Sequence, residues 1–280
     1  MNALAPCRAL VCALAAAALL PAAHAQPTEE VPFITSPDNV TLEMLRLAKV
    51  GASDHVIDLG SGDGRIVITA AKRFGATGLG VEIVPELVEQ SLRSAREAGV
   101  ADKTAFKVQD LFQTDLKPAT VITMYLLPEF NLKLRPALLA LKPGTRIVSH
   151  DWDMGDWQPD QTTVVAVPDK TVGREKSSKV HLWTVPGRVE GLWCGVGPLS
   201  SYSLRLNQHY QDVQGTLTRR ERVWDIHARM ADAVLQTEST KIGSLRLELA
   251  GDALRVIGGS GPLAMVRGAS FARSGKAQCG

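Results

Sequence analysis

The chain has 280 residues, of which 45 % are hydrophobic and 21 % are charged, and its formal net charge is +2. These proportions are typical of a soluble globular protein, and the length suits one large domain or two modest ones whose cores need no disulfide bonds. The small net charge argues against a protein that binds nucleic acid by bulk electrostatic attraction.

The first 25 residues predict an export signal. Arg8 is followed by an apolar run, residues 9–20, and then by Ala23-His24-Ala25. A basic start, a short apolar stretch and an A-x-A pattern are the parts of a secretory signal that is cleaved, here after Ala25. The run is shorter than the roughly 20 residues of a comfortable membrane span. We therefore expect a periplasmic or secreted chain without a stable membrane span; an uncleaved anchor, or a cytoplasmic product of a mis-assigned start codon, is the alternative.

Short apolar runs alternate with helical stretches between residues 38 and 187. The helices are expected at residues 40–50, 65–74, 85–98 and 132–141, and the strands at residues 55–59, 78–83, 104–109, 120–125, 146–150, 162–167 and 180–185. This alternation predicts a parallel sheet with helices on both faces, and the last two strands predict a terminal hairpin. The expected fold class is α/β, a doubly wound and mostly parallel seven-stranded sheet.

After Pro186-Gly187 the pattern changes to alternating apolar and polar residues. Such runs at residues 203–207, 213–218, 245–249 and 253–257 predict a small all-β meander or barrel. We therefore expect the sheet domain at residues 26–187, a β-rich domain at 188–270, and a Gly/Ser/Lys-rich disordered tail at 271–280. After signal cleavage Cys194 and Cys279 remain. An oxidising compartment permits a disulfide between them, and two unpaired thiols are the alternative.

A glycine-rich turn follows the first predicted strand. The turn holds Gly60, Ser61, Gly62, Asp63 and Gly64, with Asp58 just before it and Arg65 opening the next helix. Glycine tolerates positive φ and lets a ligand approach the backbone closely. The spacing is G-x-G-x-G, and Arg65 stands where a dinucleotide-binding fold would place its third glycine. These residues are the predicted cofactor turn, with a tight structural turn as the alternative.

Two further acids follow the next two strands. Glu82 ends the second strand and Asp110 ends the third. Both are expected at the carboxyl edge of the sheet, where open α/β folds bind ligands. A carboxylate at Glu82 can accept both hydroxyls of a ribose, and one at Asp110 can accept the exocyclic amine of an adenine. Taken alone, Asp110 is equally consistent with an ordinary turn acid.

The run from Asp58 to Arg65, with Glu82 and Asp110, resembles the class I S-adenosylmethionine-dependent methyltransferases. Residues 31–37, Met44-Leu45, residues 58–68 and Tyr125-Leu126-Leu127-Pro128 more narrowly resemble the small protein-lysine methyltransferases that act on the c-subunit of ATP synthase and on adenine nucleotide translocase. The resemblance covers roughly residues 31–160. It implies S-adenosyl-L-methionine as cofactor and methyl transfer to a protein lysine amine. The Asn-Pro-Pro-Tyr motif of base methylases is absent, which counts against nucleic-acid acceptors.

The remaining site predictions concern the acceptor side. Tyr125 ends the fourth strand and is the catalytic candidate, since its ring can contact an ammonium or methyl group; packing at the sheet edge is the alternative. Thr35 and Ser36 can reach the methionine carboxylate, and Asp58 can orient the turn or the methionine ammonium. No metal is expected, because the histidines show no ligand spacing. The other functions considered are a small-molecule methyltransferase and an exported protein that binds without catalysis.

Overall fold

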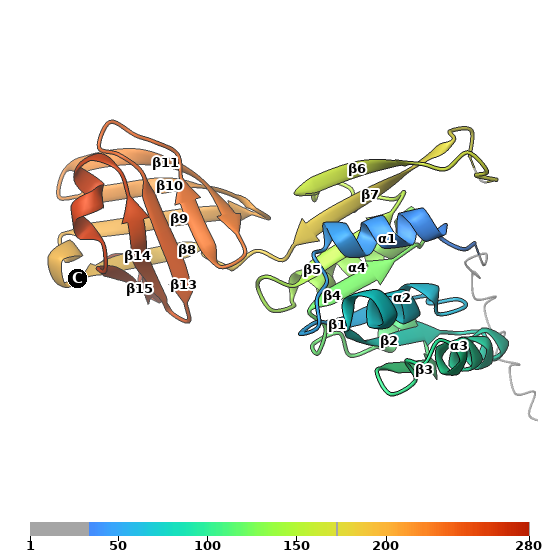
Figure 1. Ribbon diagram of the computed structural model, residues 1–280. Helices are drawn as coiled ribbons and strands as arrows, with labels where there is room; N and C mark the ends of the chain where they lie inside the picture. Colours follow the sequence, from blue (N-terminus) through green and yellow to red (C-terminus); the bar gives the residue numbers. More distant parts are fainter. Residues whose placement is uncertain (1–33, 172, 280) are drawn as a thin grey trace, which may run out of the picture. The chain divides into compact units, whose positions relative to one another are not determined.

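The computed structural model describes residues 34–171 and 173–279 (Figure 1). The predicted signal peptide at residues 1–25, and the part of the family-like segment that ends at Phe33, lie outside this range. The helices of the described chain are α1 (Asp38–Leu47), α2 (Arg65–Phe74), α3 (Pro85–Glu97) and α4 (Pro128–Leu139). None of them is long and apolar enough to cross a bilayer.

The first part of the chain forms a seven-stranded sheet of order β3-β2-β1-β4-β5-β7-β6. Its strands are β1 (His55–Leu59), β2 (Thr77–Glu82), β3 (Thr104–Val108), β4 (Val121–Met124), β5 (Arg146–His150), β6 (Gln161–Ala166) and β7 (Ser177–Thr184). Strands β1 to β5 are parallel, and β7 runs antiparallel to both β5 and β6. The predicted doubly wound sheet with its terminal hairpin is confirmed.

The local sequence explains how the sheet places its ligand edge. Strand β4 is buried throughout, and β1 is buried after His55, as central parallel strands are. Pro85 and Pro128 occupy the first positions of α3 and α4, where a missing N–H costs nothing. The strand order reverses between β1 and β4, and open α/β sheets bind their ligands at the carboxyl ends of the strands beside such a reversal. The glycine turn and Tyr125 lie on the two sides of this reversal.

The second part of the chain is a closed barrel of order β10-β11-β12-β13-β14-β15-β8-β9. Its strands are β8 (Gly191–Val196), β9 (Tyr202–His209), β10 (Asp212–Arg219), β11 (Arg222–Ala231), β12 (Val234–Thr237), β13 (Leu245–Ala250), β14 (Ala253–Gly259) and β15 (Ser270–Ser274). Alternating side chains fill the interior, among them Trp193, Leu247 and Phe271. The predicted domain boundary at residue 187 falls between the end of β7 and the start of β8.

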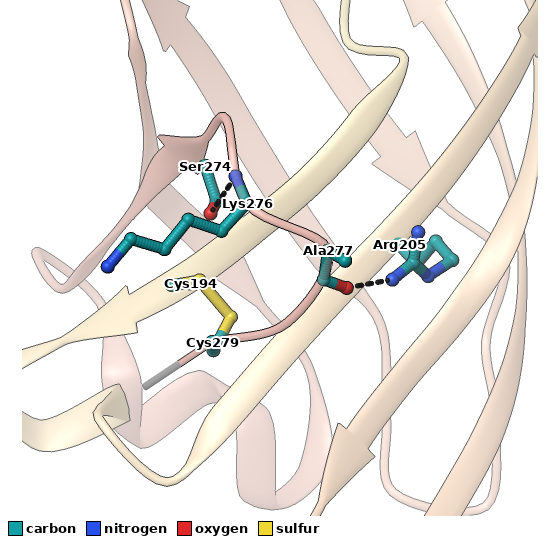
Figure 2. Close-up of a disulfide and its surroundings, with 6 residues drawn as sticks. All are labelled: Cys194, Arg205, Ser274, Lys276, Ala277 and Cys279. Atoms are coloured by element: carbon teal, nitrogen blue, oxygen red, sulfur yellow. Dashed lines mark hydrogen bonds between the residues drawn. A yellow bond between two sulfur atoms is a disulfide. The ribbon is translucent and has the colours of Figure 1, made fainter.

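The expected disordered tail at residues 271–280 is wrong for residues 271–279, and Gly280 lies outside the described residues. Strand β15 pairs with β14 on one side and β8 on the other, and so closes the barrel. Figure 2 shows the residues beyond it: Cys279 forms a disulfide with Cys194, and the carbonyl of Ala277 accepts a bond of 2.8 Å from Arg205. The Gly/Ser/Lys composition suggested disorder, but Phe271 is buried in the core and pairing on both sides holds the strand.

Candidate active site

The glycine turn after β1 has the backbone of a ligand-binding loop. Gly60, Gly62 and Gly64 have φ of 74°, 52° and 78°, in the left-handed region that favours glycine. A Cβ on Gly64 would lie 2.7 Å from the Phe106 ring, so no larger residue fits there. The Ser61 hydroxyl is buried and has no hydrogen-bond partner among the described residues. An unpaired buried hydroxyl beside a bare backbone turn fits a site built to accept a polar ligand.

Glu82 organises the backbone around this turn. Its Oε2 accepts a bond of 3.0 Å from the Gly62 N–H, and its Oε1 accepts from the N–H groups of Ile83 and Val84 at 2.8 and 3.1 Å. A carboxylate offers about four acceptor positions, so about one remains for a ligand. The expected acceptance of both ribose hydroxyls would therefore require release of a backbone bond. Glu82 therefore also holds the backbone of the glycine turn and of the residues after β2 in place.

Asp58 is the buried charge of the site. Its side chain accepts a bond of 2.7 Å from the Thr123 hydroxyl, and the residue is 2 % exposed. Burial, and to a lesser degree the nearby carboxylates of Asp63 and Glu82, raise the pKa of Asp58 to about 7. Such a carboxyl favours a cationic partner, and an amino-acid ammonium supplies one. Thr123 was missed from sequence, although a polar residue in the apolar strand next to Asp58 is a signal.

The other two predicted acids bond within the chain. Asp110 Oδ1 accepts from the Phe112 N–H at 2.8 Å and Oδ2 from the Gln113 amide at 3.1 Å, so Asp110 caps the short 3-10 helix η1 (Leu111–Gln113). Asp63 forms a two-pronged ion pair with Arg65, whose Nη2 lies 2.6 Å from Oδ2. Arg65 also donates to the carbonyl of Ser36 at 3.0 Å. This ties the segment before α1 to the glycine turn.

A cavity of about 380 Å³ adjoins the end of β4. It is bordered by the segment before α1, the ends of β4 and β5, and the connection from β6 to β7. The lining residues are Ile34, Thr35, Pro37, Asn39, Tyr125, His150, Val167, Pro168, Asp169, Lys170, Thr171 and Ser178. The structure thus brings the predicted Thr35 and Tyr125 to one cavity.

His150 forms the floor beneath Tyr125. The two rings stack with centroids 3.8 Å apart. Nδ1 of His150 is 2.8 Å from the Ser36 hydroxyl, and Nε2 is 2.9 Å from the Ser178 hydroxyl. Burial lowers the pKa of His150 to about 4, so the ring is neutral at physiological pH. The Ser36 hydroxyl is therefore committed to the histidine, which leaves Thr35 better placed than Ser36 for a ligand carboxylate.

Two charged residues, Asp151 and Lys170, form an ion pair at this end of the sheet, and only Lys170 was missed from sequence. Asp151 follows β5, and its Oδ2 accepts a bond of 2.7 Å from Nζ of Lys170. Burial, and then the Asp151 carboxylate, raise the pKa of Tyr125, so its hydroxyl stays protonated and cannot act as a base near neutral pH. Lys170 lies in a polar connection with no local motif. Among the described residues, no group of three His, Cys, Asp or Glu side chains could hold a metal.

Comparisons with known proteins identify the first part of the chain. The sequence profile of the ANTKMT methyltransferase domain matches residues 58–161. A protein-lysine N-methyltransferase of Saccharolobus islandicus is 43 % identical over 141 residues, which are 50 % of this chain and 86 % of that protein. The adenine nucleotide translocase lysine N-methyltransferase of Mus musculus is 30 % identical over 153 residues, or 54 % of this chain and 64 % of that enzyme. The chain thus spans less than two thirds of the mouse relative's length.

One solved structure adds a ligand and a different acceptor. It is described as an RNA methyltransferase from Salinibacter ruber in complex with S-adenosyl-L-homocysteine. Its sequence is 48 % identical to this chain, the TM-score is 0.51, and the match covers 56 % of this chain and 96 % of that one. The profile, the Saccharolobus islandicus relative and this structure agree on the methyltransferase fold, and the last two differ in the acceptor that their names state.

Proposed function

Because the chain belongs to the S-adenosylmethionine-dependent methyltransferase family of the ANTKMT domain, we propose that it methylates the ε-amine of a lysine in a protein. The observation that carries the proposal lies at the ends of β4 and β5, where Tyr125 lines a cavity and the carboxylate of Asp151 is close enough to Tyr125 to raise the pKa of its hydroxyl. An aromatic face and a carboxylate are the two groups that best recognise an alkylammonium. The lysine acceptors of the relatives support the same choice.

The residues divide the work of binding and positioning. S-adenosylmethionine, when bound, supplies an electrophilic methyl group on a sulfonium. Asp58 would hold the ammonium of its amino-acid part, Glu82 one ribose hydroxyl, and Ser61 a polar atom of the ligand. Transfer needs the acceptor nitrogen in line with the methyl, and this positioning supplies much of the rate.

The acceptor must also lose a proton. A free lysine has a pKa of about 10.4, and a gap of about three pH units costs roughly 4 kcal/mol. A cationic cofactor and a half-buried cavity both lower that cost because they disfavour a second positive charge. The neutral Tyr125 hydroxyl and the neutral His150 ring are not needed as strong bases.

The experiment offers competing acceptors to the full chain with methyl-labelled S-adenosylmethionine. Poly-L-lysine, total RNA and free lysine are supplied separately, and acid hydrolysates are analysed for mono-, di- and trimethyl-lysine. Label in poly-L-lysine as N-methylated lysine supports the proposal. Label in RNA alone contradicts it and favours the second candidate, an RNA methyltransferase, which is the activity named for the Salinibacter ruber structure.

We further propose that the chain acts in an oxidising compartment. The signal-like sequence of the first 25 residues and the Cys194–Cys279 disulfide support this location. The donor is made in the cytosol, so export requires a supply of it outside. N-terminal sequencing of the native protein should show that it begins at Gln26. A thiol reagent should not label it, because both remaining cysteines are in the disulfide. A native protein that begins at Met1 with reactive thiols would exclude export.

A further inference from the structure

One of the chain's own lysines lines the cavity proposed for the acceptor. Lys170 comes from the connection between β6 and β7 and lines the same cavity as Tyr125. Its Nζ donates to Oδ2 of Asp151 and to the carbonyl of Ser177, both at 2.7 Å. The Lys170 side chain is 14 % exposed, so this contact is largely shielded from water. A largely shielded ammonium, already paired with a carboxylate, therefore forms part of the wall of this cavity.

Asp151 is held as a rigid receptor for that ammonium. Its φ is 62°, a left-handed conformation that a residue with a Cβ adopts only when its surroundings impose it. Its N–H donates to the carbonyl of Lys179 at 2.7 Å, while its Oδ1 accepts from the Lys179 N–H at 2.9 Å. These two backbone bonds fix the carboxylate and leave Oδ2 facing Lys170.

The turn after Asp151 is fixed from a second direction. Asn131, fully buried on α4, donates through its side-chain amide to the carbonyls of Trp152 and Asp153 at 3.3 and 3.1 Å. Burial alone would raise the pKa of Asp151, but the bonds from Lys170 and Lys179 outweigh it and leave that pKa below its usual value. The carboxylate is thus charged, and a charged group this shielded needs a cation beside it.

We propose that Asp151 anchors the ammonium of the incoming lysine and that Lys170 occupies this anchor until the acceptor displaces it. The inference rests on the proposed lysine acceptor. Lys170 and an acceptor lysine carry the same group, so they compete for the same oxygen. Two bonds, to Asp151 and to the carbonyl of Ser177, hold Nζ of Lys170 against the wall of the cavity, which makes Lys170 a competitor and not a substrate. Displacement then exchanges one ion pair for another.

The test measures KM and kcat of the full chain with poly-L-lysine and S-adenosylmethionine. If Lys170 fills the anchor about nine-tenths of the time, Lys170→Met lowers the KM for poly-L-lysine about tenfold and leaves kcat within about twofold. Asp151→Asn raises that KM, and adding Lys170→Met to it changes nothing more. The matched control is Lys176→Met, since Lys176 is an exposed lysine of the same connection that donates to the carbonyl of Lys170 at 2.8 Å; its KM equals the wild-type value.

Calorimetry with S-adenosylhomocysteine establishes that each variant keeps its cofactor site. A KM for Lys170→Met equal to the wild-type KM, in an enzyme that methylates poly-L-lysine, overturns the inference and leaves the proposed function intact. Methylation of Lys170 itself, seen by peptide mass mapping, also overturns it, because the residue would then be an acceptor. Absence of poly-L-lysine methylation in wild type and Lys170→Met alike shows instead that the proposed function has failed.

Discussion

The sheet region buries many polar side chains, whereas the barrel buries few. In the barrel, Gln211 and Thr237 are the buried polar side chains among the described residues, and the interior cluster is entirely apolar. The sheet region buries Asp58, Ser61 and His150 along one edge. Burying such groups costs free energy that folding alone does not require. The buried polar groups at the carboxyl edge of the sheet fit a ligand site, whereas the interior of the barrel fits packing alone.

The largest expected effect is a loss of barrel stability when the disulfide is removed, with no change in cofactor binding by the sheet region. Cys194 and Cys279 are 85 residues apart, and loss of a cross-link over such a loop costs about 4.6 kcal/mol if the disulfide acts by lowering the entropy of the unfolded chain. Cys279→Ser should therefore lower the free energy of unfolding of the barrel by about that amount, measured by urea titration. The affinity for S-adenosylhomocysteine should stay at the wild-type value. A matching loss of affinity would mean that the barrel supports the site.

Glu82→Ala should weaken cofactor binding and leave the stability of the barrel unchanged. The change removes the proposed ligand contact and also frees the N–H groups of Gly62, Ile83 and Val84. We expect cofactor affinity to fall by about 3 kcal/mol, more than one hydrogen bond is worth, with the barrel unaffected. Calorimetry with S-adenosylhomocysteine measures it. Glu86→Ala, an exposed acid in the first turn of α3, is the control and should bind as wild type does; equal losses in both variants would remove Glu82 from the site.

The titration of Asp58 gives a smaller effect with a defined sign. Its pKa of about 7 means that the free protein holds the proton below neutral pH, while a cationic ligand favours the ionised form. Cofactor affinity should therefore rise about tenfold from pH 6 to pH 8, with a proton released on binding below pH 7. Calorimetry in buffers of different ionisation enthalpy reads both quantities. Asp58→Asn should bind weakly and without this pH dependence; an unchanged pH profile in that variant would assign the proton to another group.

Tyr125→Phe should have the smallest effect. The ring keeps its stack on His150, so the affinity for S-adenosylhomocysteine should not change. Turnover on poly-L-lysine should fall only severalfold, because the hydroxyl is neutral and serves to orient, and not to deprotonate, the acceptor. Single-turnover kinetics measure the step directly. A loss of more than about a thousandfold would instead assign the hydroxyl a direct part in proton transfer.

Local signals explain what could be predicted from the sequence. The glycine turn and Glu82 stood out because a strand, a G-x-G-x-G turn and an acid at the next strand end are close in sequence. Strand alternation predicted the β-rich region, but not the pairing of β8 with β15 that closes it, since those strands are far apart in the chain. The contact between Lys170 and Asp151 depends on the β6–β7 hairpin and on the positive φ of Asp151. No spacing in the sequence predicts either feature.

Ser36 and Asp110 are residues whose positions were predicted from the sequence but whose hydrogen-bond partners were not. Both were expected to face a ligand, but the sequence could not show that their side chains already have partners in His150 and in η1. A polar residue near a strand end satisfies its hydrogen bonds with whatever the fold brings near. The place of a residue at a strand end follows from the local sequence pattern, whereas its hydrogen-bond partners depend on tertiary contacts.

Hydrogen–deuterium exchange of the full chain, with and without S-adenosylhomocysteine, tests the contrast between sheet and barrel most directly. We expect slower exchange on binding in peptides that cover residues 58–64 and 82–84, which hold the backbone N–H groups of the proposed site. Exchange should stay unchanged in the strands from Gly191 to Ser274. Protection confined to those barrel strands, with the glycine turn unchanged, would contradict this contrast.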